Sequence, residues 1–212
     1  MKKHLFFLTT IIFLAISCTG QKGDSEVITD AYNNYQIAVS SKNIDEMVSY
    51  ISEETIAYYN NIVEKAKFSD SVNLSMQPPI DKTLILYLRQ TMSSSSLEKY
   101  SGKELMYFTL SKGLNVKNRL PITELKKINL NGNEATAEFL VDGVDSGNQI
   151  KFKKEGKNWK IDISSTYNLT ANNQFRQNLY QSGLSENVFI KYMVTNMSGS
   201  EMNDSIWHKT IK

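Results

Sequence analysis

Cysteine and histidine are almost absent from this chain of 212 residues, which has one cysteine and two histidines. With Cys18 alone, no disulfide can form within the chain. Histidine is the commonest acid–base residue near neutral pH, and beyond residue 17 only His208 remains. We expect His208 to be a solvated residue near the end of the chain rather than a catalytic one.

Motifs for metal, nucleotide or acyl-transfer chemistry are also absent. The sequence contains no HExxH, CxxC, Walker loop or GxSxG. Ser96-Leu97-Glu98-Lys99 fits the SxxK pattern of penicillin-binding enzymes, but the companion Ser-Asp-Asn and Lys-Thr-Gly motifs are missing. We therefore expect no metal, no cofactor and no catalytic residue that a motif can identify.

An excess of basic charge is missing once the first residues are set aside. Lys2 and Lys3 precede Cys18, so residues 18–212 hold 22 basic and 22 acidic side chains. A nucleic-acid-binding protein needs a basic footprint. The balance of charge therefore argues against a nucleic-acid partner.

The longest apolar run lies at the start of the chain. Lys2 and Lys3 are followed by an uncharged run from Leu5 to Ile16. As a helix this run would be about 18 Å long, too short for a hydrocarbon core of about 30 Å. A basic start, a short apolar core and small residues at its end predict an export signal.

The residues at the end of this run fit two kinds of cleavage site. Ala15-Ile16-Ser17 suits an ordinary signal peptidase, whereas Leu14-Ala15-Ile16-Ser17-Cys18 resembles the bacterial lipoprotein box, with Leu one place earlier than the box prefers. The resemblance implies a signal peptide over 1–17, acylation of Cys18 with palmitate-type chains and anchoring to a lipid bilayer. Several acyl chains hold a protein firmly. By the same resemblance to lipoproteins, Thr19 after the cysteine favours the outer membrane over the plasma membrane of the cell envelope. The domain would then face the periplasm or the surface.

Residues 18–25 are polar and small, which predicts a flexible tether. Helical spacing then predicts a first helix over 26–41, and Asn43 with Glu46 forms a capping box for a second. Ser52 is expected to cap a third helix, although 55–59 could be a short strand. We expect a loop over 68–79, a helix after Asp81, a serine linker over 93–96 and a helix from Ser101 to Gly113.

The hydrophobic period changes to two after Pro121. Asn131-Gly132, Asp142-Gly143 and Glu155-Gly156 separate four alternating segments, which predicts a four-strand antiparallel meander with one buried face. Helices are expected over 174–180 and from Ser185 to Gly199, followed by a loosely held polar tail over 199–212 in which Trp207 is the one candidate for burial. Residues 26–198 are therefore expected to form one α+β domain.

Two parts of this domain resemble the NTF2-like (cystatin-like α+β cone) superfamily. Residues 38–52, AVSSKNIDEMVSYIS, are similar to its opening helix, polar turn and short second helix. Residues 131–138, NGNEATAE, and 153–162, KKEGKNWKID, are similar to its last two hairpins. The resemblance implies N-terminal helices packed on a curved sheet, with a cone-shaped cavity that residues 53–120 or the extra C-terminal helices could fill or cover.

Some members of that superfamily are isomerases or dehydratases with an acid in the cavity. Asp162 is the nearest candidate here, but it alternates with Trp159, Ile161 and Ile163 and is expected to face solvent. Tyr58, Tyr59 and Tyr107 could line a cavity, although packing in the core is the simpler expectation.

Three functions remain open. The leading hypothesis is a membrane-anchored, non-catalytic lipoprotein that binds a small ligand or a protein partner. The second is an isomerase- or dehydratase-like enzyme, which requires a cavity with an inward carboxylate. The third is an immunity or envelope-assembly protein that acts through its surface.

Overall fold

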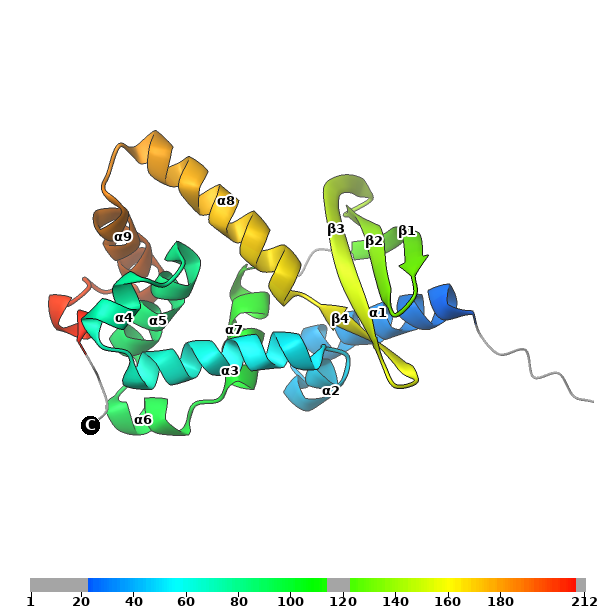
Figure 1. The fold of residues 1–212 in the computed structure, drawn as a ribbon, viewed down its shortest axis with the longest axis horizontal. Helices are drawn as coiled ribbons and strands as arrows, with labels where there is room; N and C mark the ends of the chain where they lie inside the picture. The colour runs from blue at the N-terminus through cyan, green and yellow to red at the C-terminus, as the bar shows by residue number, and fades with distance from the viewer. Residues whose placement is uncertain (1–22, 114–122, 209–212) are drawn as a thin grey trace, which may run out of the picture.

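Two groups of elements lie at opposite ends of the long axis of the molecule (Figure 1). The computed structural model describes residues 23–113 and 123–208. The sheet lobe contains α1 (Asp24–Ser40), α2 (Ile44–Ser49), β1 (Thr123–Asn131), β2 (Glu134–Val141), β3 (Val144–Glu155) and β4 (Asn158–Asp162). The helical lobe contains α3 (Glu53–Phe68), α4 (Ser71–Ser75), α5 (Pro79–Thr91), α6 (Ser94–Lys99), α7 (Gly102–Gly113), α9 (Glu186–Ser198) and the 3₁₀ turn η1 (Asp204–Trp207). A long helix, α8 (Ser164–Ser182), runs from the sheet to α9 (Figure 1). The expected α+β class is confirmed.

The sheet is the expected antiparallel meander, in the order β1-β2-β3-β4. A glycine with positive φ lies in each turn between consecutive strands. Asp142 and Gly143 both have positive φ, 49° and 80°, which a two-residue type I′ turn requires. β3 begins at Val144, earlier than the alternation from Ile150 indicates, because Val141 pairs directly with Val144 across this tight turn.

Helix α1 covers one face of the sheet (Figure 1). Its buried stripe meets Phe152 and Trp159, and the rings of Tyr32 and Phe152 pack edge to face with centroids 6.3 Å apart. Gln36 and Tyr32 also hydrogen-bond to Thr123 at the start of β1. The helix begins at Asp24, two residues before the expected start, so Asp24 and Ser25 are helical and do not belong to the tether expected over 18–25.

The free edge of β4 is covered by the connection between α2 and α3. Ile51 forms a parallel bridge with Ile161, and the Ser52 amide donates to the Ile161 carbonyl at 2.9 Å. Pairing of this kind removes an exposed sheet edge. Residues 55–59 are helical, and Ser52 caps α3 by accepting from the Thr55 amide, as the helical alternative requires.

Two segments expected to be loops contain short helices. The expected loop over 68–79 includes α4, which Asp70 caps by accepting from the Asn73 amide. The expected serine linker includes α6, which Ser93 caps in the same way. Short polar residues favour loops and helix starts equally, so composition alone could not separate the two. The Ser101–Glu104 capping box is confirmed at the start of α7.

A close contact joins α7 to α3. A Cβ on Gly102 would lie 2.4 Å from the backbone nitrogen of Asn60, closer than any side chain can be placed. Instead, the Gly102 amide donates to the Asn60 side-chain oxygen at 3.1 Å. Glycine is therefore required here by packing against α3.

The C-terminal part differs most from expectation. α8 starts at Ser164, ten residues before the expected helix at 174. Residues 200–208 are not loosely held: Met202 is 2 % exposed, whereas Trp207, the expected buried residue, is only half-buried. The Gln90 side chain donates to the Glu201 carbonyl and accepts from the Asn203 amide. Contacts from α5 thus hold this segment, and His208 is exposed as expected.

Candidate functional site

Asp162 is buried, contrary to the expectation that it faces solvent. It lies at the end of β4 on the face opposite Ile161, as the alternation requires, but its exposure is only 1 %. The start of α3 and the start of α8 cover this corner of the outer face. Alternation gives the face of a residue correctly, but it does not reveal what covers that face.

The polar groups around Asp162 form a connected cluster. Its Oδ1 accepts from Thr55 Oγ1 at 3.2 Å and from Ser164 Oγ at 2.8 Å. Thr55 Oγ1 in turn accepts from Ser52 Oγ and from the amides of Ile163 and Ser164. Four of these residues are no more than 6 % exposed: Ser52, Thr55, Asp162 and Ser164.

One cation completes the cluster. Lys153 Nζ lies 3.8 Å from Asp162 Oδ2 and also pairs with Glu54. The hydrogen bond to Glu54 raises the pKa of Lys153, and the charge of Asp162 adds to that shift. The carboxylate of Asp162 is thus bound to hydroxyls and a lysine at the point where β4, α3 and α8 meet. This arrangement joins the two lobes, and the Asp162 carboxylate within it is buried.

The three candidate tyrosines lie on α3 and α7, in the core or packed against it. Tyr59 is fully buried, and its hydroxyl is hydrogen-bonded to Thr109 at 3.0 Å. Tyr58 packs edge to face on Tyr59 but sends its hydroxyl to Asp81 Oδ1 at 2.7 Å. Tyr107 is half-buried and packs against the core. Packing in the core, the simpler expectation, holds for Tyr59, and Tyr58 and Tyr107 pack against that core.

Buried charges on α5 were not predicted from the sequence. Asp81, Lys82 and Arg89 are 7 %, 4 % and 5 % exposed. Burial raises the pKa of Asp81, and the Tyr58 hydroxyl and the charge of Lys65 partly offset that effect. Lys82 pairs with Glu186 of α9 at 2.6 Å. The sequence offered one signal for their burial: charged residues occur within the otherwise apolar stripe of α5.

Arg89 binds backbone carbonyls from two distant segments. Its guanidinium donates to the carbonyls of Ala66 and Ser69, where α3 ends. It also donates to the carbonyls of Ile206 within η1 and His208 just after it. Carbonyls at a helix C-terminus carry partial negative charge, so they suit a cation. Burial lowers the pKa of Arg89. This side chain holds the C-terminal segment against the end of α3.

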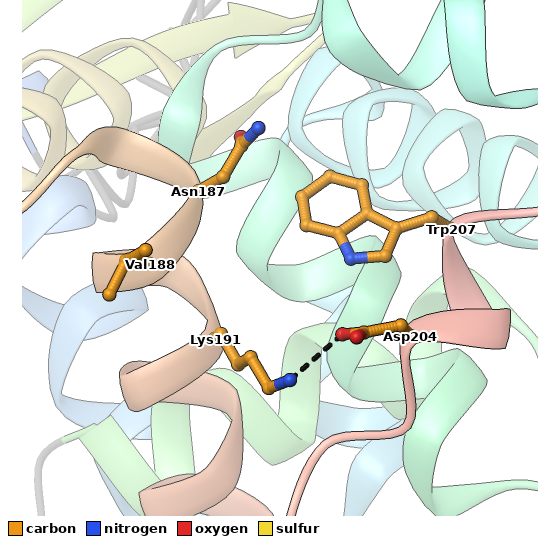
Figure 2. Close-up of a pocket in the computed structure, with 5 residues that line it drawn as sticks. All are labelled: Asn187, Val188, Lys191, Asp204 and Trp207. Atoms are coloured by element: carbon orange, nitrogen blue, oxygen red, sulfur yellow. Dashed lines mark hydrogen bonds and ion pairs between the residues drawn. The ribbon is translucent and has the colours of Figure 1, made fainter.

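A surface pocket of about 380 Å³ lies between α9 and η1. Figure 2 shows Asn187 and Lys191 extending from α9 toward Asp204 and Trp207, with Val188 on the neighbouring side of the helix. Lys191 Nζ and Asp204 Oδ1 are 2.9 Å apart and close one side. The pocket presents a half-buried indole and a paired rather than free charge, which suits an apolar group with a polar edge.

The anchor residue predicted from the sequence, Cys18, lies outside the described residues. The first helical residue, Asp24, is bound at the β3–β4 hairpin: its Oδ1 accepts from Trp159 Nε1 and from Lys154 Nζ, both at 2.9 Å. These contacts lower the pKa of Asp24, with Trp159 contributing most. The first residues of α1 therefore lie at the sheet end of the molecule (Figure 1).

Within 23–113 and 123–208, no group of three or more His, Cys, Asp or Glu side chains is arranged to hold a metal ion. None of the helices in these ranges is long and apolar enough to cross a bilayer. Comparison of the chain with models of known protein families, with curated proteins and with solved structures found no match.

Proposed function

We propose that the protein is a lipoprotein of the bacterial cell envelope, acylated at Cys18, whose helical lobe binds a partner or a small ligand without catalysing a reaction. The observation that carries the proposal is the position of the α9–η1 pocket at the opposite end of the molecule from the start of α1 (Figure 1). A protein anchored at one end presents the other end to the surrounding compartment.

The short tether supports this orientation. Five residues lie between Cys18 and Asp24, which makes six Cα-to-Cα steps. An extended chain spans about 3.3–3.6 Å per step, so the tether reaches at most about 20 Å. Asp24 contacts Trp159 and Lys154, so the sheet lobe lies next to the end of the tether. On this proposal the sheet lobe faces the membrane, most simply the outer membrane.

An NTF2-like origin of the sheet lobe is part of the proposal. The packing of α1 across a four-strand meander supports it, as does the short α2 capped by Asn43. Helices α3 to α7 are then a large insertion between α2 and β1. They form a second lobe instead of lying over the sheet (Figure 1).

The anchor is tested by labelling cells with a palmitate analogue. The full chain is expected to incorporate the label and to sediment with membranes, whereas Cys18→Ala incorporates none. Thr19→Ala is the matched control and keeps the label. Equal labelling of the Cys18→Ala variant would overturn the lipoprotein assignment.

Binding at the pocket is tested by a screen of small molecules and peptides against the melting temperature of the purified protein. A true ligand is expected to raise the melting temperature of the full chain but not of Trp207→Ala, because that variant removes the indole wall. A ligand that shifts both proteins equally binds elsewhere.

An enzyme remains a second candidate because of one observation. Asp81 is a buried carboxyl group with a raised pKa, and the Tyr58 hydroxyl lies 2.7 Å from it. Such a pair can act as a general acid and base. If the protein is an enzyme of this kind, Asp81→Asn is expected to abolish a measured turnover that Asp162→Asn leaves largely intact. If Asp81→Asn has no effect on an observed turnover, the pair does not take part in it.

A further inference from the structure

Strand β1 lies at one edge of the sheet, and no strand of the described residues pairs with its outer side. Its first part is protected from pairing. Gln36 Nε2 donates to the Thr123 carbonyl at 2.8 Å, and Gln36 Oε1 accepts from the Thr123 amide at 3.4 Å, so the outward backbone groups of Thr123 are occupied. A bulge at Lys126 then interrupts the register with β2. Bulges and charged residues commonly protect a sheet edge.

The second part of β1, residues 127–131, has neither the bulge nor the glutamine contact, and we call it the open edge. Its pairing with β2 is regular up to the two-residue turn that Asn131 and Glu134 close. The backbone groups of a strand alternate between its two sides. Because Asn131 pairs with Glu134 across the turn, Ile128 and Leu130 direct their amide and carbonyl groups outward. Leu130 is also 48 % exposed, so the open edge offers both backbone groups and an apolar side chain.

These groups fit the open edge of a second copy in one register. If two open edges meet antiparallel across a two-fold axis at Asn129, Ile128 of each copy exchanges both backbone hydrogen bonds with Leu130 of the other. A shift of one residue would leave these outward groups facing residues whose own groups point inward, and a shift of two would involve the bulge or the turn. Ile128 and Leu130 are two residues apart and share one face of the strand, so in this register their side chains also pack on their counterparts.

The charges near the open edge are compatible with its own copy. Lys127 would lie opposite Asn131 of the second copy, and its neighbour on β2 is Glu138 of its own chain. Lys126, at the bulge, is paired with Asp145 at 3.0 Å. Like charges are therefore not opposed in this register, whereas like charges directly opposite one another would destabilise an antiparallel pair.

We propose that the open edge pairs with the open edge of a second copy, so that two four-strand sheets form one continuous sheet across a two-fold axis. The proposal does not depend on acylation of Cys18. Pairing over so short a stretch is expected to bury less than the roughly 800 Å² per partner of a standard interface, so the dimer is expected to be weak. Anchoring of two copies to one membrane would raise their effective concentration and favour the same contact.

Disulfide trapping of the purified protein tests this register. The chain carrying Cys18→Ala has no other cysteine, so Asn129→Cys adds a single thiol on the proposed axis. Opposed residues of a non-hydrogen-bonded antiparallel pair have Cα atoms about 4.5 Å apart, which a disulfide can bridge. Mild oxidation is expected to give a covalent dimer of twice the chain mass. Absence of a covalent dimer would overturn the proposal.

Lys127→Cys and Asn131→Cys in the same background are the matched controls. Each position lies two residues from the axis, so it is about 14 Å from the same position in the second copy, and neither chain alone is expected to cross-link. An equimolar mixture of the two chains is expected to cross-link, because Lys127 lies opposite Asn131. Equal yields from all three single-cysteine chains would indicate random collision and would overturn the proposal.

A further substitution separates pairing from folding. Leu130→Lys in the Asn129→Cys chain places two lysines diagonally across the axis, and it is expected to lower the cross-linked yield about tenfold with an unchanged melting temperature. Val144→Lys is the matched control, since Val144 is an apolar residue of the same sheet that is 69 % exposed, and it is expected to keep the yield. An unchanged yield with Leu130→Lys would contradict the pairing.

Oxidation of cells that express the Asn129→Cys chain tests for another occupant of the open edge. A band of twice the chain mass is expected. A cross-linked band of a different mass in its place would show that an extended segment of another protein pairs with β1, and it would overturn the pairing of two copies.

Discussion

The sheet lobe and the helical lobe are stabilised in different ways. In the sheet lobe, large apolar side chains from α1 and neighbouring strands fill the core, with Phe152, Trp159 and Ile161 at most 2 % exposed. In the helical lobe, α5 carries three buried charges whose partners come from distant parts of the chain. Arg89, for example, binds a carbonyl 119 residues away. The first lobe depends on apolar burial, and the second depends equally on satisfying polar groups at a distance.

The two lobes meet at a buried polar cluster. Asp162, Thr55 and Ser164 connect the last strand to α3 and α8 through short hydrogen bonds. A buried polar cluster is favourable only when all its members are paired. The corner therefore fixes how the two lobes sit on one another, and variants can test each lobe and the corner separately.

The largest expected effect is in the sheet core. Trp159→Ala removes a fully buried indole, its hydrogen bond to Asp24 and its contact with Lys154. Substitutions of this kind cost about 3–5 kcal/mol in the free energy of unfolding. Chemical denaturation measures the loss, and hydrogen exchange shows whether α9 is exposed at the same time. Full protection of α9 in this variant would mean that the lobes unfold independently.

A smaller and more local effect is expected in the helical lobe. Arg89→Met keeps much of the side-chain volume but leaves carbonyls of Ala66, Ser69, Ile206 and His208 without their donor. An unsatisfied buried group costs about 1–3 kcal/mol. Hydrogen exchange is expected to rise over 200–208 and to stay unchanged in β2 and β3. Faster exchange in the sheet instead would contradict the separation of the two lobes.

The corner between the lobes is expected to be less sensitive to charge than to shape. Asp162→Asn keeps an oxygen for Thr55 and Ser164 but removes the charge that faces Lys153. We expect a loss of about 1 kcal/mol, as for one hydrogen bond. Asp142→Asn is the control, since Asn-Gly suits the same type I′ turn and should change stability little. Thermal unfolding compares the two, and equal effects would show that the corner has no special role.

The smallest effects are expected from two aspartates whose pKa values are shifted in opposite directions. The lowered pKa of Asp24 means that its contribution is present above the ordinary value of 3.8 and is lost as the pH falls. The raised pKa of Asp81 means the reverse: the folded state binds the extra proton, so stability falls as the pH rises above 3.8. Asp24→Asn should therefore destabilise at pH 7, and Asp81→Asn should stabilise.

Melting temperatures between pH 3 and pH 7 check both aspartates. Each difference from the unaltered protein is expected to shrink toward the acid end of that range. The contribution of Asp24 is lost as the pH falls below 3.8, and the Asp81 carboxyl is protonated below its raised pKa. A difference for Asp81→Asn that persists at low pH would show that the effect comes from packing and not from charge.

Local patterns were enough to predict the elements of the sheet lobe. Ala135, Ala137, Phe152, Trp159 and Ile161 alternate as strand residues do, and all five are buried. The caps at Asn43, Ser52 and Ser101 are confirmed because a capping contact spans only three residues. The position of Cys18, just after an apolar run, is likewise a local pattern, and acylation there remains a prediction.

Only the tertiary structure decided which polar residues are buried and what holds the end of the chain. The burial of Asp162 depends on α3, more than 100 residues earlier in the sequence, and the order of residues 200–208 depends on Gln90 and Arg89. Such contacts have no local period, because they arise from the way helices cross in space. The sequence by itself therefore determined which segments form helices and strands, where hydrogen bonds and apolar faces repeat over a few residues. Folding determined the partners of the buried charges, where the free energy of a polar group depends on neighbours that are far away in the chain.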